Sequence, residues 1–164
     1  MTPELLRRLA RYNAWANGRL YAACGQLTAE ELARPCPSFF GSILATLNHL
    51  LVVDRVWMGR FKGVKDTGIT SLDQMLHADF AELAAARTAY DVHLVEWFDA
   101  LESDLGRPFQ YRIMAGNKVE SPLGLTMLHM FNHQTHHRGQ VHDMLSATAV
   151  APPPLDLIYF LREG

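Results

Sequence analysis

The sequence has few of the features that tie a protein to nucleic acid, a membrane or an oxidising compartment. Its 15 lysines and arginines stand against 17 aspartates and glutamates, so no basic excess is available to neutralise phosphates. No window approaches the roughly 20 uninterrupted apolar residues of a membrane-spanning helix. The only two cysteines, Cys24 and Cys36, do not form a C-x-x-C motif. We therefore expect a cytoplasmic protein with no nucleic-acid or membrane partner, in which both cysteines serve packing.

Length and composition predict a single domain over residues 1–164. The chain is 49% hydrophobic and 20% charged, which is the balance of a globular protein rather than of a disordered one. A domain of this length buries roughly 70% of the surface of its unfolded chain, so one core is sufficient. Neither an internal repeat nor a low-complexity tract divides it.

Apolar residues at helical spacing predict four long helices, over residues 2–27, 41–61, 71–101 and 121–146. The second is apolar on nearly every side and must be largely buried. The third follows Ser71-Leu72-Asp73-Gln74, a spacing typical of a capping box. The fourth begins with Ser121 as its N-cap and Pro122 in its first turn. These segments predict an all-α protein, a four-helix bundle whose sites are made by side chains of facing helices.

Three smaller elements complete the predicted fold. A capping box at Thr28-Ala29-Glu30-Glu31 starts a short helix that ends before Pro35. Alternating residues 109–113 and the turn pair Gly116-Asn117 predict a small β-hairpin between the third and fourth long helices. After a triple proline, residues 155–161 predict a short C-terminal helix that docks on the bundle through four apolar side chains: Leu157, Ile158, Phe160 and Leu161.

Histidine is abundant, and five of the eight histidines lie in the fourth long helix. At about 100° per residue, His133 and His137 share a face with Met130 and Val141, whereas His129 and His136 turn toward a polar side. Imidazoles four residues apart lie one turn from each other and can reach the same ion. His133 and His137 are therefore the inward pair.

His49 occupies a position in the second helix where a hydrocarbon would be expected. It lies on one stripe with Val52, Val53 and Val56, and an unpaired imidazole there would be costly. A metal would satisfy one ring nitrogen, and the other could donate to a backbone carbonyl or a carboxylate. A single buried histidine is more often a hydrogen-bonded core residue, and an H-x-x-x-H pair arises by coincidence about as often as it binds a metal. Spacing alone therefore leaves both interpretations open.

Other histidine-based chemistry is disfavoured. In the H-E-x-x-H metalloprotease motif a glutamate general base follows the first histidine, and here that position is Gln134. His77, His93 and His142 have no partner at ligand spacing and are expected at the surface. A zincin-type peptidase is therefore not the prediction.

Four segments resemble a known family. They are Arg11-Tyr12-Asn13-Ala14-Trp15-Ala16-Asn17, Leu47-Asn48-His49-Leu50, residues 132–140 with the sequence NHQTHHRGQ, and residues 155–161 with the sequence LDLIYFL. Together they resemble the DinB/YfiT-like four-helix bundles, named after a DNA-damage-inducible bacterial protein that is distinct from the DNA polymerase of the same name. The resemblance implies one divalent metal ion per chain, usually zinc or nickel, held by His49, His133 and His137. It also implies a homodimer, and some related proteins use small thiols such as bacillithiol, mycothiol or glutathione.

This ligand set leads to a functional expectation. Three neutral imidazoles leave the ion its full +2 charge and at least one open position, as in catalytic rather than structural zinc sites. We expect a metal-dependent enzyme, either a thiol S-transferase or a hydrolase, that accepts a small thiol or small anion. The alternative is a non-catalytic metal-binding or stress-response protein that acts through protein interaction. No catalytic residue is assigned, and the candidates for the surrounding pocket are Tyr12, Trp15, Asn48, Gln134 and Gln140.

Overall fold

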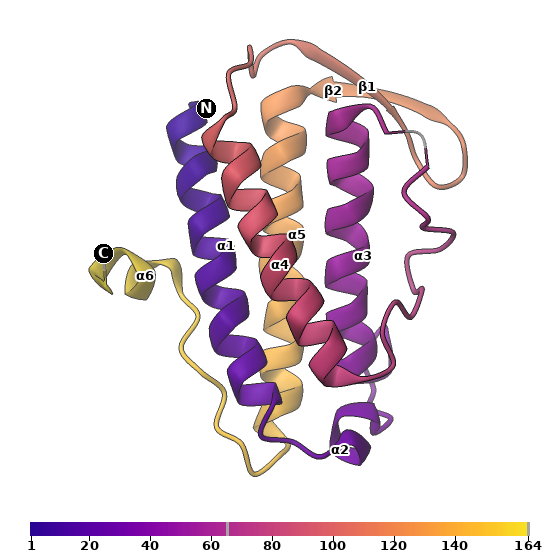
Figure 1. The fold of residues 1–164 in the computed structure, drawn as a ribbon, viewed down its shortest axis with the longest axis vertical. Helices are drawn as coiled ribbons and strands as arrows, with labels where there is room; N and C mark the ends of the chain where they lie inside the picture. The colour runs from indigo at the N-terminus through magenta and orange to yellow at the C-terminus, as the bar shows by residue number, and fades with distance from the viewer. Residues whose placement is uncertain (65, 164) are drawn as a thin grey trace.

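A computed structural model describes residues 1–64 and 66–163 of the chain. Its elements, in order, are α1 (Pro3–Cys24), α2 (Ala29–Ala33), α3 (Ile43–Lys62), α4 (Phe80–Asp99), β1 (Pro108–Arg112), β2 (Lys118–Pro122), α5 (Leu123–Ser146) and α6 (Leu157–Glu163). The four long helices run side by side, with the β-hairpin across one end of the bundle and α2 at the other (Figure 1). The predicted four-helix bundle with a hairpin and a short C-terminal helix is confirmed. Among the described residues, no helix is long and apolar enough to cross a membrane.

Side-chain caps fix where most helices begin. Thr2, Ser42 and Asp79 accept hydrogen bonds from the backbone N–H groups at the starts of α1, α3 and α4. At α2 the predicted capping box is present, because Thr28 and Glu31 bond each other's backbone N–H groups.

Two predicted helix starts are wrong. The third long helix begins at Phe80 rather than near Ser71, because Gln74 accepts a hydrogen bond from the backbone of Thr70 instead of closing a capping box. Ser121 does not cap α5. It lies in β2, where it pairs with Phe109, and α5 begins at Leu123 without a side-chain cap. The hairpin thus takes over the residues that were expected to start the helix.

The segment between α3 and α4 turns back along the outside of α3 (Figure 1). We call residues 66–79 the return loop. Asn48 holds it, since its Oδ1 accepts hydrogen bonds from the backbone N–H groups of Leu76 and His77 at 2.9 and 3.0 Å. Thr67 packs so closely on Gly59 of α3 that no Cβ would fit there. The loop is therefore seated on α3 at both of its ends.

The C-terminal helix α6 docks less fully than predicted. Phe160 packs on Tyr12 and Trp15 with ring centroids 5.9 and 5.8 Å apart. Leu157, Ile158 and Leu161, which were expected to dock as well, remain exposed. A seven-residue helix on the outside of α1 has only one face against the bundle, so Phe160 is its apolar anchor, and Glu163 adds polar contacts with Trp15 and Arg19.

Candidate metal centre

Three histidines meet between the facing sides of α3 and α5. One nitrogen of each of His49, His133 and His137 lies within 4.8 Å of the other two, and no other such cluster of metal-ligating side chains occurs in the part of the chain that the structure describes. His129 and His136 lie on the exposed side of α5, as the helical angles predict. The sequence-predicted trio is thus brought together, and neither His129 nor His136 belongs to the cluster, although His136 lines the same pocket.

The spacing of the nitrogens suits a tetrahedral ion. Nε2 of His49 lies 3.3 Å from Nε2 of His133. Two ligands at 2.0–2.1 Å from a tetrahedral zinc are about 3.3 Å apart, so this edge already has the required length. The ring of His137 lies 4.6 Å from that of His49 and 4.3 Å from that of His133, measured between centroids. One small ion between the three rings fits this arrangement.

The second nitrogens of two rings are held by acceptors. Nδ1 of His49 lies 2.7 Å from the carbonyl oxygen of Leu72 in the return loop, and Nδ1 of His137 lies 2.7 Å from Oε1 of Gln140. Both oxygens only accept, so both Nδ1 atoms carry the proton and both Nε2 atoms present a lone pair to the cluster. This is the arrangement in which metal-bound histidines are usually oriented. Nδ1 of His133 is buried and has no partner among the described protein atoms.

Burial keeps the three imidazoles neutral at pH 7. It lowers the pKa of His49 to about 4, with a smaller contribution from the neighbouring His137. It lowers the pKa of His133 to about 3, with added repulsion from His137 and His49. The pKa of His137 is also lowered, again chiefly by burial. Only the neutral imidazole can donate to a metal, so the cluster is ready to ligate without first losing protons.

The trio opens into a pocket of about 850 Å³, within the range of small-molecule sites. Phe40 forms one wall, stacked on His49 with ring centroids 3.9 Å apart and set edge-on to His137. Phe39 is 86% exposed at the rim. The remaining wall is formed by Leu72 and Asp73 of the return loop. Because Phe40 shields one side of the ligands, access to them is from the solvent side of the pocket.

Comparison with known proteins places the chain in a family. The model of a family described as the DinB family matches residues 1–163. The chain belongs to the DinB family. A curated relative of this DinB-family chain is Protein DinB of Bacillus subtilis strain 168, which is 25% identical over 159 residues, covering 94% of this chain and 92% of the relative.

A solved structure also resembles the DinB-family chain. It is the crystal structure of a DinB-like protein from Bacillus cereus, which superposes with a TM-score of 0.60 over 85% of this chain and 89% of that one. At 19% sequence identity this likeness concerns the fold alone.

A buried polar network that is not among the predicted features lies behind the histidines. Gln134 turns away from the pocket and donates hydrogen bonds to the carbonyl of Leu50 and to Asp54, at 2.9 and 2.7 Å. Asp54 pairs with Arg87 at 2.7 Å, and Arg87 pairs with Asp91 at 2.8 Å. The signal was present in the sequence, because these charged residues occupy apolar helix positions. They fix α3, α4 and α5 relative to one another.

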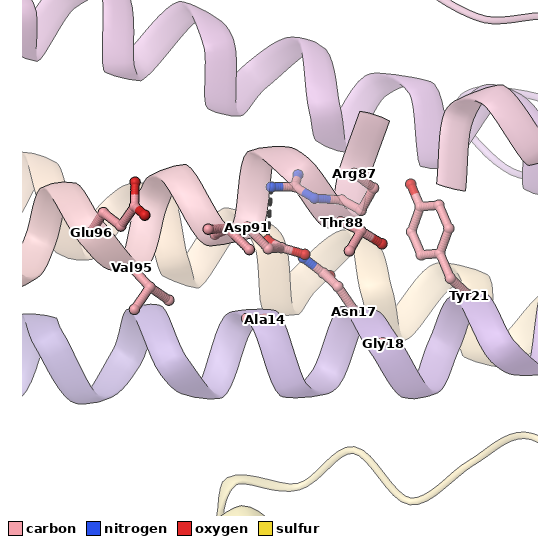
Figure 2. A pocket seen from close by; sticks show the side chains of 10 residues that line it. Ala14, Asn17, Gly18, Tyr21, Arg87, Thr88, Asp91, Val95 and Glu96 are labelled. Carbon is pink, nitrogen blue, oxygen red and sulfur yellow. Dashed lines mark hydrogen bonds and ion pairs between the residues drawn. The ribbon is translucent and has the colours of Figure 1, made fainter. Parts of the chain in front are cut away.

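Figure 2 shows the outer side of this network, at a smaller pocket of about 310 Å³ between α1 and α4. Asn17 reaches Asp91 there with a hydrogen bond of 3.0 Å, and Arg87 lies over the same carboxylate. Burial raises the pKa of Asp91 to about 6, although Arg87 opposes the rise. Apart from Nε of Arg87 and Oε1 of Gln134, which have no partner among the described protein atoms, these polar groups bond one another, so in this DinB-family chain the network serves as a structural clamp.

The five residues predicted to surround the site have four different roles. Gln140 directly contacts His137, one of the three candidate metal ligands. Asn48 acts on the site through the return loop, and Gln134 belongs to the buried network. Tyr12 and Trp15 lie away from it and hold the C-terminal segment, with hydrogen bonds to the Leu155 carbonyl and to Glu163.

Proposed function

We propose that this DinB-family protein is a metal-dependent enzyme that binds one divalent ion, zinc or nickel, through Nε2 of His49, His133 and His137. The observation that carries the proposal is the shared orientation of the cluster. Two of the three rings have their Nδ1 protons fixed by oxygen acceptors and turn their Nε2 lone pairs toward the cluster. A buried histidine with a purely structural role does not need to turn an unprotonated Nε2 toward two other imidazoles.

The charge of the ligand set determines the substrate class. Imidazoles contribute no negative charge, so a bound ion keeps its +2 and acts as a Lewis acid that favours the deprotonated form of a thiol or of water. Three protein ligands leave at least one position on the pocket side. A small thiol or small anion is therefore the expected occupant of the pocket.

The chain's own residues favour thiol S-transfer or a simple hydrolysis over peptide cleavage. The position after His133 is occupied by Gln134, which is turned into the core and bonded to Asp54, so it cannot act as a general base. The return loop and Gln140 orient two ligand rings, and Phe40 excludes water from one side of them. Asp73 and His136 also line the pocket, next to the three ligands.

The alternative is a metal-binding protein without catalytic activity that acts in a stress response or through protein interaction. It is favoured by the small number of polar groups that line the pocket besides the three ligands. The two functions differ in whether the site turns over a substrate, so they can be separated by experiment.

The test uses protein loaded with cobalt, whose visible spectrum reports its ligands. Titration with glutathione and with cysteine should produce a thiolate-to-metal charge-transfer band in the wild type and in the control His142→Ala, a histidine of α5 that does not line the pocket. Turnover of an aryl halide with the same thiols would then identify the transferase. If no thiol and no small anion changes the spectrum, the open-site proposal fails. If thiols bind without turnover of any electrophile or ester, the non-catalytic function is the better one.

A further inference from the structure

A second concave site lies at the hairpin end of the bundle, away from the histidines. It is a pocket of about 640 Å³ between the C-terminal part of α3 and the face of the β-hairpin, with the start of the return loop along its edge. Its lining combines apolar side chains with three cations: Arg60 from α3, and Arg112 and Lys118 from the hairpin. None of the described residues that line it carries a carboxylate, although the chain as a whole has a net charge of -2.

Arg60 is held in place without a charge partner. Its guanidinium stacks over the rings of Trp57 and Tyr111, with the central carbon 4.4 and 5.2 Å from the two centroids. Among the described residues it forms no ion pair and no hydrogen bond. Partial burial lowers the pKa of Arg60, which means that the surrounding protein disfavours its charge. Cation–π stacking orients this group but leaves its five donors available.

The hairpin register adds an unfavourable pair of like charges. Arg112 and Lys118 are directly opposite each other across the two strands. Like charges in such a pair are destabilising. The nearest hairpin carboxylate, Glu120, accepts a hydrogen bond from Gln110 at 2.8 Å and makes no ion pair with either cation. Arg112 donates to the carbonyl oxygen of Gly116, which does not neutralise its charge.

A local feature that lowers stability and has no structural compensation is expected at functional sites. Arg60, Arg112 and Lys118 all line this concavity, and the apolar side chains Val56, Ile69 and Met114 line the same space. The volume lies within the range of small-molecule sites. An anion would neutralise the cations, and an apolar body attached to it would cover the hydrocarbon lining.

We propose that the pocket between α3 and the hairpin binds a small organic anion, a carboxylate on an apolar body of a few carbons, with Arg60 as its main partner. Arg112 and Lys118 flank the carboxylate, and Tyr111 and Ile69 contact the body. The described residues that line it include none of those that line the pocket of the three histidines, so the two sites are separate.

Hexanoate is a suitable probe, and calorimetry on the metal-loaded protein measures its binding. For a ligand of this size we expect a dissociation constant on the order of 1 mM that rises with ionic strength. Arg60→Gln should weaken binding tenfold or more, and the double variant Arg112→Gln/Lys118→Gln, on exposed hairpin side chains, should weaken it similarly. The matched control is Arg55→Gln on the same helix, where the guanidinium lies over Tyr90 and outside the pocket. It should bind as the wild type does.

Further probes test the need for the charge and for the apolar body separately. A variant of the metal centre then distinguishes this pocket from the metal site. Neither 1-hexanol, which lacks the charge, nor inorganic phosphate, which lacks the body, should bind as tightly as hexanoate. His49→Ala should retain hexanoate binding, and loss of binding in that variant would place the carboxylate on the metal instead. Absence of saturable hexanoate binding, or unchanged affinity in both Arg60→Gln and the double variant, would overturn the proposal. So would equal binding of phosphate or of hexanol.

Discussion

At the scale of single residues, the three histidines differ in what holds their second nitrogen. His49 is fixed by a loop carbonyl and His137 by a side chain three residues further along its own helix. His133 has only packing around Nδ1. Two rings are thus fixed before any ion arrives, and the third is free to adjust its tilt within the space between them.

This difference leads to a prediction for metal content. Replacing His49, His133 or His137 by alanine removes one of three nitrogens and should lower the metal bound to untagged protein from about one ion per chain to a small fraction of that. His136→Ala, on the exposed side of the same helix, is the control and should retain the ion. Elemental analysis of the purified variants provides the measurement. Full metal content in all three inward variants would contradict the ligand assignment.

The sequence was sufficient to select these three residues but not the groups around them. Helical angle alone separates His133 and His137 from His129 and His136. In a regular helix the residue number determines the direction in which a side chain projects from the axis. The acceptor for His49 could not be found this way, since Leu72 lies in a segment that was expected to be helical. A carbonyl that is free to accept exists there only because the chain is irregular.

At the scale of elements, the helices are joined by charge as well as by apolar packing. Arg87 of α4 is 1% exposed and lies between Asp54 of α3 and Asp91 of its own helix. Removal of one partner from a buried ion pair leaves an uncompensated charge, which is far more costly than the loss of an exposed pair.

We therefore expect Arg87→Met to lower the free energy of unfolding by about 3–5 kcal/mol. The control is Arg11→Met, which breaks the exposed pair with Asp99 and should cost less than about 1 kcal/mol. Urea denaturation followed by circular dichroism measures both. A loss of less than about 1 kcal/mol for Arg87→Met would mean that the network does not clamp the helices.

The boundaries of the elements were harder to predict than their existence. Four long apolar patterns were enough for the four helices, because only a helix of that length buries so wide a stripe. The predicted start of α4 is wrong because Ser71 and Gln74 have the spacing of a capping box without forming one. Gln74 instead accepts a hydrogen bond from the backbone of Thr70 within the loop. The start of α5 was missed because strand pairing with Phe109 competes for Ser121, and no local rule includes a partner strand.

For the molecule as a whole, the buried histidines make stability depend on pH. The ordinary pKa of histidine is about 6.5, and burial lowers it to about 4 in His49 and about 3 in His133. Between these values the unfolded chain binds protons that the folded chain does not. The free energy of unfolding therefore falls as the pH falls below about 6.5, and the stabilisation is fully present only above that pH.

Metal-free protein in urea should show this loss between pH 7.5 and pH 4.5. Asp91 acts in the opposite direction over part of this range, because its pKa is raised to about 6. The double variant His49→Phe/His133→Phe keeps the Asp91 contribution and removes the two histidines, so its stability should decline less on acidification. Equal pH dependence of the two proteins would contradict the assignment.

We also expect a homodimer, on the basis of family resemblance and of exposed apolar side chains on the long helices. Val92 of α4 is 55% exposed beside the groove between α1 and α4. Light scattering should give twice the single-chain mass of 18.5 kDa. Val92→Glu should shift the protein to the single-chain mass, whereas Leu125→Glu, at a position of α5 that is 57% exposed, should not. A single-chain mass for the wild type would contradict the expectation.

The positions of the three histidines along the chain have a mechanical consequence. His49 and His133 are 84 residues apart in sequence, and both cysteines are free thiols. An ion bound to both would close this stretch into a ring, as a covalent cross-link does. In the chain-entropy description of such closures, a ring of this size restricts the unfolded ensemble by about 4–5 kcal/mol. The metal would then act as the cross-link between α3 and α5 in a protein whose two cysteines form no disulfide. Its release would remove the constraint from both helices at once.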